Sequence, residues 1–257
     1  MGWQEVIEAP EAPERVRAVA SPLESARFGR TVARITVSAE STTPLRDVRA
    51  AVAESAADVV VLRYPAAYVG WFAELTTLGR TAVLADSLAY WRLRAGEGRA
   101  PRPTADLTVG GGADPAEVRA LVRDVFAAYG NHYLADPLFD PAAALAGYEE
   151  WALGSTAAGE CLTLRGPAGP LALATLAEDP ARTEILLAGV VAAARGRGVY
   201  AHLLRAVEER TVSRGAAEVV ISTQGHNTGV QRAWARYGFE PVHTALTVHL
   251  IRSPLPR

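Results

Sequence analysis

The residues best suited to bind a ligand lie in the segment ARGRG at positions 194–198. It follows an apolar run typical of a strand and precedes a stretch with the apolar spacing of a helix. Gly196 and Gly198 allow the backbone to approach a ligand closely. Arg195 and Arg197 add positive charge, and the first amides of the following helix are free to bind an anion. We therefore predict a diphosphate-binding turn; the alternative is an arginine-rich helix N-terminus without a ligand.

Two familiar diphosphate ligands do not suit the rest of the sequence. A nucleoside triphosphate held by a P-loop needs a lysine, and all 26 basic residues are arginine. Residues 196–201, GRGVYA, match the glycine pattern of dinucleotide-binding turns, but that pattern requires an acidic residue at the end of the next strand. The acidic residue of that strand, Glu218, lies at its beginning instead. A coenzyme that carries a diphosphate stays open as the ligand.

His249 is a candidate general base, because histidine titrates near neutral pH. It lies in the run TALTVHLI, where strand alternation places His249 and Thr247 on one face and the larger apolar side chains on the other. The alternative is a strand histidine that is exposed or hydrogen-bonded for structural reasons.

A second polar group lies in the segment 128–140, where Asn131, His132 and Tyr133 are consecutive and Asp136 follows. Such a cluster suits a hydroxyl-rich acceptor such as a sugar, with Asp136 placed to attract an amine. The alternative is a set of local capping and turn hydrogen bonds. The five histidines lack the paired spacing of metal ligands, so no metal site is predicted.

Composition argues against several classes of partner. The 257-residue chain has a net charge of −2, so no bulk positive field favours nucleic acid or an anionic membrane. No run approaches the roughly 18 apolar residues of a membrane span, and the acidic N-terminal segment lacks the apolar core of a signal peptide. The single cysteine, Cys161, excludes disulfides and is typical of a small buried residue. We expect a cytoplasmic protein without nucleic-acid or membrane partners.

The sequence predicts an α/β protein with two domains. Residues 1–97 contain a strand–helix–strand–helix–strand pattern and form a small α/β domain. The segment 98–112, rich in glycine and proline, is predicted to be a linker. Residues 113–257 follow the order helix, helix, three strands, helix, strand, helix, strand, which indicates a mixed α+β sheet. Its first helix is marked by a capping box from Asp114 to Glu117.

The boundaries of several elements follow from the same patterns. Helices are expected over 68–79, from Asp140-Pro141 to near residue 151, and over 197–213. Strands are expected over 81–94 and 244–251.

The segment VVAAARGRGVYAHLL, residues 190–204, resembles the coenzyme motif [QR]-x-x-G-x-[GA] of the GNAT superfamily of N-acyltransferases. Arg195 and Gly198 match the motif, and Tyr200 stands where the family has Gly or Ala. The segment 222–241 is similar to the strand–Asn–helix–GF segment of the same family, with Asn227 at the Asn position. Among these enzymes the likeness is greatest to sugar N-acetyltransferases of the dTDP-fucosamine type.

The resemblance implies a GNAT fold over residues 113–257 behind the smaller domain, and acetyl-CoA or another acyl-CoA as cosubstrate. The cofactor-binding residues that it implies are Val190, Arg195, Gly196, Arg197, Gly198, Val199, Tyr200, Asn227 and Trp234. The substrate-binding candidates are Asn131, His132, Tyr133, Asp136 and Gln224. The catalytic candidates are His249, His132 and Tyr237.

Trp234 occupies the position where the family usually has the tyrosine that protonates the departing thiolate. An indole is no practical acid, so solvent or another group must supply this proton. Tyr237, one helical turn further on, is a candidate for this role; its alternative is a core position.

The resulting prediction is an acyl-CoA-dependent N-acyltransferase that acts on a primary amine of a small molecule by direct attack in a ternary complex. The favoured acceptor is a nucleotide-linked amino sugar in natural-product or polysaccharide assembly. Two alternatives stay open: an enzyme acting on a peptide or protein amine, and a CoA-binding regulatory domain without catalysis. A homodimer is compatible with the sequence.

Overall fold

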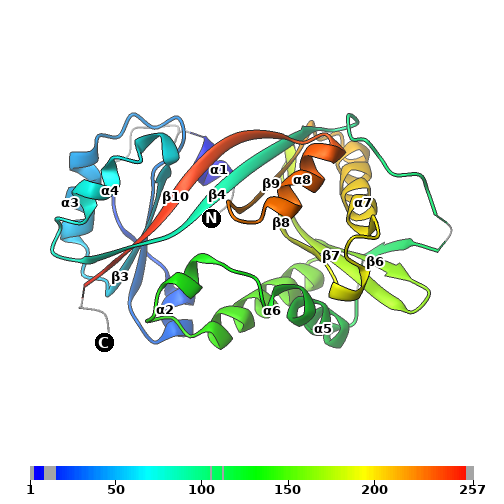
Figure 1. Ribbon diagram of the computed structural model, residues 1–257, viewed down its shortest axis with the longest axis horizontal. Coiled ribbons are helices and arrows are strands. Elements are labelled where there is room, and N and C mark those ends of the chain that lie inside the picture. Colours follow the sequence, from blue (N-terminus) through cyan, green and yellow to red (C-terminus); the bar gives the residue numbers. More distant parts are fainter. Residues whose placement is uncertain (1–2, 9–15, 105, 112, 253–257) are drawn as a thin grey trace.

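One mixed ten-stranded sheet runs through the molecule, with the strand order β1-β2-β3-β10-β4-β9-β8-β7-β6-β5 (Figure 1). The computed structural model describes residues 3–8, 16–104, 106–111 and 113–252. The strands are β1 (Val19–Ala20), β2 (Val32–Thr36), β3 (Val59–Pro65), β4 (Thr81–Arg94), β5 (Thr108–Gly111), β6 (Cys161–Gly166), β7 (Gly169–Glu178), β8 (Arg182–Val190), β9 (Glu218–Gln224) and β10 (Glu240–Ile251).

Helices cover both faces of this sheet. The α-helices are α1 (Trp3–Ile7), α2 (Pro22–Phe28), α3 (Leu45–Glu54), α4 (Trp71–Leu75), α5 (Pro115–Phe126), α6 (Pro141–Ala157), α7 (Val199–Ser213) and α8 (Thr228–Tyr237). The 3-10 turns are η1 (Ala66–Tyr68), η2 (His132–Ala135) and η3 (Ala192–Ala194). Helices α7 and α8 pack on one face of the C-terminal part of the sheet, and α5 and α6 pack on the opposite face (Figure 1). Helices α3 and α4 cover the part formed by β2, β3 and β10. No helix among these described residues is long and apolar enough to cross a bilayer.

Strands β4 and β10 join the N-terminal and C-terminal parts of the chain. β10 lies between β3 and β4, antiparallel to both, and Figure 1 shows β4 and β10 running side by side across the molecule. The far half of β4 pairs with β9 from Leu88–Gln224 to Arg94–Glu218. The strand that closes the small α/β pattern of the sequence is therefore also an internal strand of the C-terminal part.

The mixed α/β class predicted from the sequence is confirmed, and most of the predicted elements are present. The capping box of α5 is formed, with the Asp114 side chain accepting from Ala116 N at 2.7 Å. Three boundaries differ: α6 continues to Ala157, the helix expected over 68–79 is reduced to η1 and α4, and β10 begins at Glu240.

The segment expected to link two domains is held against the C-terminal helices. Glu208 of α7 accepts hydrogen bonds from the amides of Gly96 and Gly98, at 2.9 and 2.8 Å, and from the Tyr237 hydroxyl at 2.7 Å. A Cβ atom on Gly98 would lie 2.1 Å from Glu208 Oε2 and 2.4 Å from Tyr237 Cε1, so a larger residue there would displace both side chains. Further along, β5 forms at Thr108–Gly111 and pairs with β6, so part of the expected linker is a strand. The division at 98–112 stays a prediction about how the two parts fold.

Removal of residues 1–97 tests that division. We expect a fragment of residues 98–257 to lack a cooperative thermal transition, because β9 and β10 lose β4 and expose unpaired strand edges. Circular dichroism during heating measures this, with the full chain as control. A cooperative transition in the fragment would show that the C-terminal part folds independently.

Candidate active site

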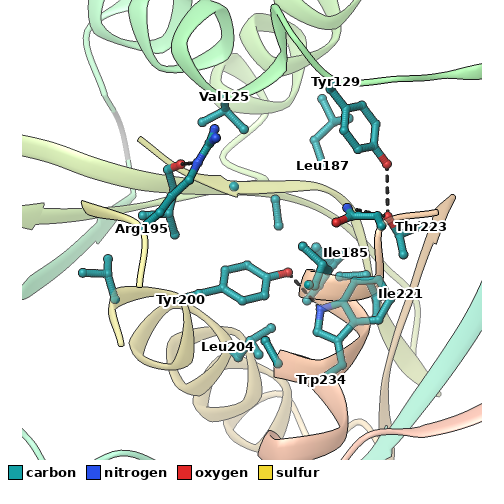
Figure 2. Close-up of a pocket in the computed structure, with 18 of the residues that line it drawn as sticks. Val125, Tyr129, Ile185, Leu187, Arg195, Tyr200, Leu204, Ile221, Thr223 and Trp234 are labelled. Atoms are coloured by element: carbon teal, nitrogen blue, oxygen red, sulfur yellow. Dashed lines mark hydrogen bonds between the residues drawn. The ribbon is translucent and has the colours of Figure 1, made fainter. Parts of the chain in front are cut away.

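The candidate active site begins where two parallel strands separate. β8 pairs with β9 only from Arg182–Glu218 to Ile185–Ile221. Beyond this point β8 stays paired with β7, up to Val190–Ala172, while β9 stays paired with β4. A cavity of about 960 Å³ opens between the diverging strands. Figure 2 shows Val125 and Tyr129 of the α5 region on one side of it, and Tyr200 and Trp234 of α7 and α8 on the other.

The backbone of Val190 faces the gap between the strands. Val191 N donates to Leu171 O of β7 at 2.9 Å. Because successive peptide groups of a strand point to opposite sides, the N–H and C=O of Val190 point away from β7 and towards the gap. The carbonyl accepts a hydrogen bond from Arg195 Nε at 3.1 Å (Figure 2). The amide is thus placed to donate to a ligand along β8, as the sequence motif implies for this residue.

The glycine turn before α7 has the geometry of an anion-binding site. Gly196 and Gly198 have φ angles of 74° and 79°, and no atom lies within 4 Å of the position of a Cβ at either residue. Gly198 is the N-cap of the 15-residue α7 and has no side chain to occupy the free amides at the start of that helix. Val199 is buried behind the turn, whereas Arg195 and Arg197 are exposed. This bare, positively polarised turn fits a diphosphate group.

Tyr200 and Trp234 form a hydrogen-bonded pair on the cavity wall. Trp234 Nε1 donates to the Tyr200 hydroxyl oxygen at 2.9 Å (Figure 2). An indole N–H is only a donor, so the hydroxyl proton of Tyr200 must point elsewhere. Burial raises the pKa of Tyr200, although the hydrogen bond from Trp234 acts in the opposite direction. Tyr200 is therefore a neutral hydroxyl with a proton available to the cavity at physiological pH.

The other candidate acid, Tyr237, has a different environment. It also lines the cavity, but its hydroxyl donates to Glu208 on the side of the 96–98 segment. Burial, together with the hydrogen bond to Glu208 and its negative charge, raises the pKa of Tyr237. The proton of Tyr237 is thus already engaged.

Side chains from the segment after α5, from β9 and from the N-cap of α8 meet at the end of the cavity. The Tyr129 hydroxyl donates to Gln224 Oε1 and lies 3.1 Å from Thr223 Oγ1. Asn227 Nδ2 also donates to Thr223 Oγ1, at 3.1 Å. The structure thus brings the predicted residues Gln224 and Asn227 together on the wall. Tyr129 was missed by sequence reasoning, although it lies within the segment 128–140 that was singled out, two residues before Asn131.

Three predicted residues form a buried chain outside this cavity. His249 Nδ1 lies 2.8 Å from Asp136 Oδ2, and His249 Nε2 lies 2.9 Å from His132 Nδ1. His249 lies on β10, whereas His132 and Asp136 lie in the segment around η2. All three residues are buried. With Asp136 Oδ2 as the acceptor of the Nδ1 proton, His249 Nε2 accepts from His132 Nδ1–H, which leaves a lone pair on His132 Nε2. His249 has no free ring nitrogen and is fully buried, so it acts on a substrate only through His132.

The remaining polar residues of this segment have structural partners. Asn131 Oδ1 accepts from the Tyr133 amide at 3.0 Å and caps η2, as in the local-capping alternative. The Tyr133 hydroxyl donates to Glu24 at 2.6 Å, and Glu24 also pairs with Arg34 of β2. Burial acts to raise the pKa of Glu24, but the hydrogen bond and charge of Arg34 outweigh it and lower the pKa. Tyr133 thus fastens the 131–136 segment to the N-terminal part.

Residues 124–239 match the sequence profile of the Acetyltransferase (GNAT) family. No curated protein sequence is significantly similar to the chain. A GCN5-related N-acetyltransferase from Sphaerobacter thermophilus has a similar structure, with a TM-score of 0.64 and 17% identity over 96% of this chain and 79% of that chain. One from Kribbella flavida has a TM-score of 0.54 and 17% identity, over 86% of this chain and 81% of that chain. A GCN5-related glucosamine N-acetyltransferase region of a fungal multi-domain β-N-acetylglucosaminidase has a TM-score of 0.55 and 13% identity, over 91% of this chain and 31% of that chain.

The diverging strands, the glycine turn and the profile match define the class of the protein. The profile match assigns residues 124–239, somewhat less than half of the chain, to the Acetyltransferase (GNAT) family. Enzymes of this family generally use acetyl-CoA. The enzyme class predicted from the sequence is thereby confirmed, and the family resemblance is confirmed for residues 124–239; the narrower likeness to dTDP-fucosamine enzymes stays a prediction.

The buried histidine chain predicts a pH dependence of stability. Burial, with the nearby His249 and the cations Arg63 and Arg34, lowers the pKa of His132 well below its ordinary value. Below about pH 6.5 the unfolded chain binds a proton at this residue that the folded chain does not. The free energy of unfolding should therefore fall by up to about 1.4 kcal/mol per pH unit as the pH drops below 6.5.

Urea unfolding at pH 7, 6 and 5 measures this dependence. His132→Asn keeps a donor near Nδ1 but does not titrate, so we expect a flatter dependence in this variant. Equal slopes for the two proteins would contradict a neutral buried His132.

Proposed function

We propose that the protein transfers an acetyl group from acetyl-CoA to a primary amine of a small hydroxylated molecule, by direct attack in a ternary complex. The observation that carries this proposal is the cavity between β8 and β9, with the bare glycine turn at one end. The favoured acceptor is a nucleotide-linked amino sugar in natural-product or polysaccharide assembly, in the cytoplasm. The polar wall at Tyr129 and Gln224 supports a hydroxylated acceptor, and the likeness in fold to the fungal glucosamine N-acetyltransferase region is compatible with it.

Each part of the coenzyme has a matching group in the cavity. The amides after Gly198 and the charges of Arg195 and Arg197 would hold the diphosphate. The Val190 amide would donate to the carbonyl of the thioester, where negative charge develops during attack. The bound coenzyme supplies an activated acetyl group at the end of its pantetheine arm.

We propose that the chain Asp136–His249–His132 serves as the base. Asp136 fixes the tautomer of His249, which fixes that of His132, so that the lone pair lies on His132 Nε2. The lowered pKa of His132 keeps it neutral, with the Nε2 lone pair free, at physiological pH. The proton of the acceptor amine would leave towards this nitrogen through water, because His132 does not line the cavity.

We propose Tyr200 as the acid that protonates the departing thiolate. Trp234 holds the hydroxyl oxygen, and the proton is directed away from Trp234. The tyrosine that the family usually places on the helix after the Asn is thus replaced by a tyrosine on the preceding helix, at the motif position where Gly or Ala is usual.

A non-catalytic coenzyme-binding domain and an enzyme for peptide or protein amines are the alternatives. An amine panel with acetyl-CoA separates them: CoA release with small amino sugars supports the proposal, and release only with peptides supports the second alternative. If the protein binds acetyl-CoA but releases no CoA with any amine, the result supports the first alternative, a non-catalytic coenzyme-binding domain. Sedimentation of the full chain tests the homodimer.

Coenzyme binding tests the glycine turn. We expect Gly198→Val to weaken CoA binding at least tenfold in calorimetry, because a side chain at φ 79° strains the turn and covers the amides. Gly159→Val is the matched control. Gly159 has a φ of 75° and the same open surroundings, but lies outside the cavity lining, so its CoA affinity should be unchanged. Equal CoA affinities of the wild type and the Gly198→Val variant would show that the diphosphate does not bind at this turn.

Turnover tests the acid. With an amine that supports CoA release, Tyr200→Phe should lower kcat about 10- to 100-fold, because the variant lacks the hydroxyl proton. A loss of this size is at or just below the lower end of the rate effects typical of general acids. The CoA affinity of Tyr200→Phe should change less than threefold. Tyr237→Phe is the control, because its hydroxyl is bound to Glu208 and we expect it to keep most of the activity. A larger loss of kcat in Tyr237→Phe than in Tyr200→Phe would assign the role of the acid to Tyr237 instead.

A further inference from the structure

Asp86 of β4 is a partly exposed residue whose two carboxylate oxygens are covered and have no hydrogen-bond partner among the described residues. No ion pair within the described part of the chain includes Asp86. Arg63 of β3 lies two strands away and level with Asp86, because both residues pair with Thr247 of β10. Arg63 Nε instead donates to Thr247 Oγ1 at 3.2 Å. An unpaired buried carboxylate is costly, so its presence calls for an explanation.

The position of Asp86 on β4 places it beside the cavity. Leu88, two residues along, lines the cavity, and so does Gln224, which pairs with Leu88 on β9. Alternate residues of a strand share a face, so Asp86 projects on the same side as Leu88, about 7 Å further along. The negative charge of Asp86 also adds to the burial that raises the pKa values of Tyr129 and Tyr148, both of which line the cavity.

The histidine chain lies on the other side of Asp86. Thr247 of β10 pairs with Asp86 across the strands, and His249 is two residues further along on the same face as Thr247. Asp86 therefore stands between the acceptor end of the cavity and the base chain. A group held there would reach the cavity on one side and the histidines on the other.

We propose that Asp86 binds the ammonium group of the acceptor, so that the substrates are amines that arrive as cations. This inference rests on the proposed function and names the class of acceptor for that site. A carboxylate without a partner in the free protein gains its partner when the ammonium enters. Neutral amines such as arylamines, and N-acetylated products, lack the charge and are disfavoured.

The first test needs no acceptor and uses the full chain. Asp86→Asn keeps the shape but removes the unpaired charge, so we expect its Tm to exceed that of the wild type by roughly 2–4 °C. Asp58→Asn is the matched control. Asp58 accepts from Thr31 N and Oγ1 at 2.9 and 2.8 Å, so the same change there should not raise the Tm. A lower Tm for Asp86→Asn would mean that the carboxylate is satisfied in the free protein, which overturns the inference.

The second test uses CoA release with acetyl-CoA and a panel of glucosamine, putrescine and aniline. We expect activity with alkylammonium acceptors only, and a KM for the accepted amine at least tenfold higher in Asp86→Asn, with CoA affinity unchanged. An unchanged KM would overturn the ammonium site while leaving the acetyltransferase proposal intact. If none of the amines causes the wild type to release CoA, the proposed function fails. The Tm comparison alone then decides whether Asp86 is an unpaired carboxylate.

Discussion

The pairing of β4 with both β9 and β10 is the constraint on which the active site depends. Beyond Ile221, β9 has lost β8 as a neighbour, and its residues up to Gln224 are paired on one side only, with β4 from Leu88 to Tyr90. The gap between β8 and β9 stays open because each strand is held by a different partner. One wall of the coenzyme cavity is therefore fixed by a strand from the N-terminal part of the chain.

Polar contacts repeat this connection between the two parts. Glu24 and Arg34 hold Tyr133, and the chain from Asp136 through His249 to His132 joins β10 to η2. Such networks stabilise a fold when their members are satisfied, and the carboxylates of both networks, Glu24 and Asp136, have hydrogen-bond partners. Asp86, on the same face of the sheet, breaks this rule, and departures of this kind occur mainly where a protein binds or reacts.

Local chemistry made much of the fold predictable. The Asp114 capping box and the glycine turn before α7 depend on neighbouring residues, and both were found as expected. The order of the strands was not predictable, because the pattern of β4 does not show that β9 and β10 are its partners. His249 was singled out as a base from its alternation, but its contacts with Asp136 and His132 join residues 113 and 117 positions apart. Asp86 gave no signal, since an acidic residue in a strand is ordinarily solvated, and only the packed structure shows that its oxygens are covered.

The place of β10 between β3 and β4 also affects how the chain acquires its structure during synthesis. β3 and β4 leave the ribosome roughly 150–190 residues before the strand that separates them, and closing so long a loop is slow. Until then both strands present open edges that invite pairing with each other or with other chains. Nascent copies of this protein should therefore depend on chaperones that shield β-strand edges, and their yield should fall when translation outpaces that protection.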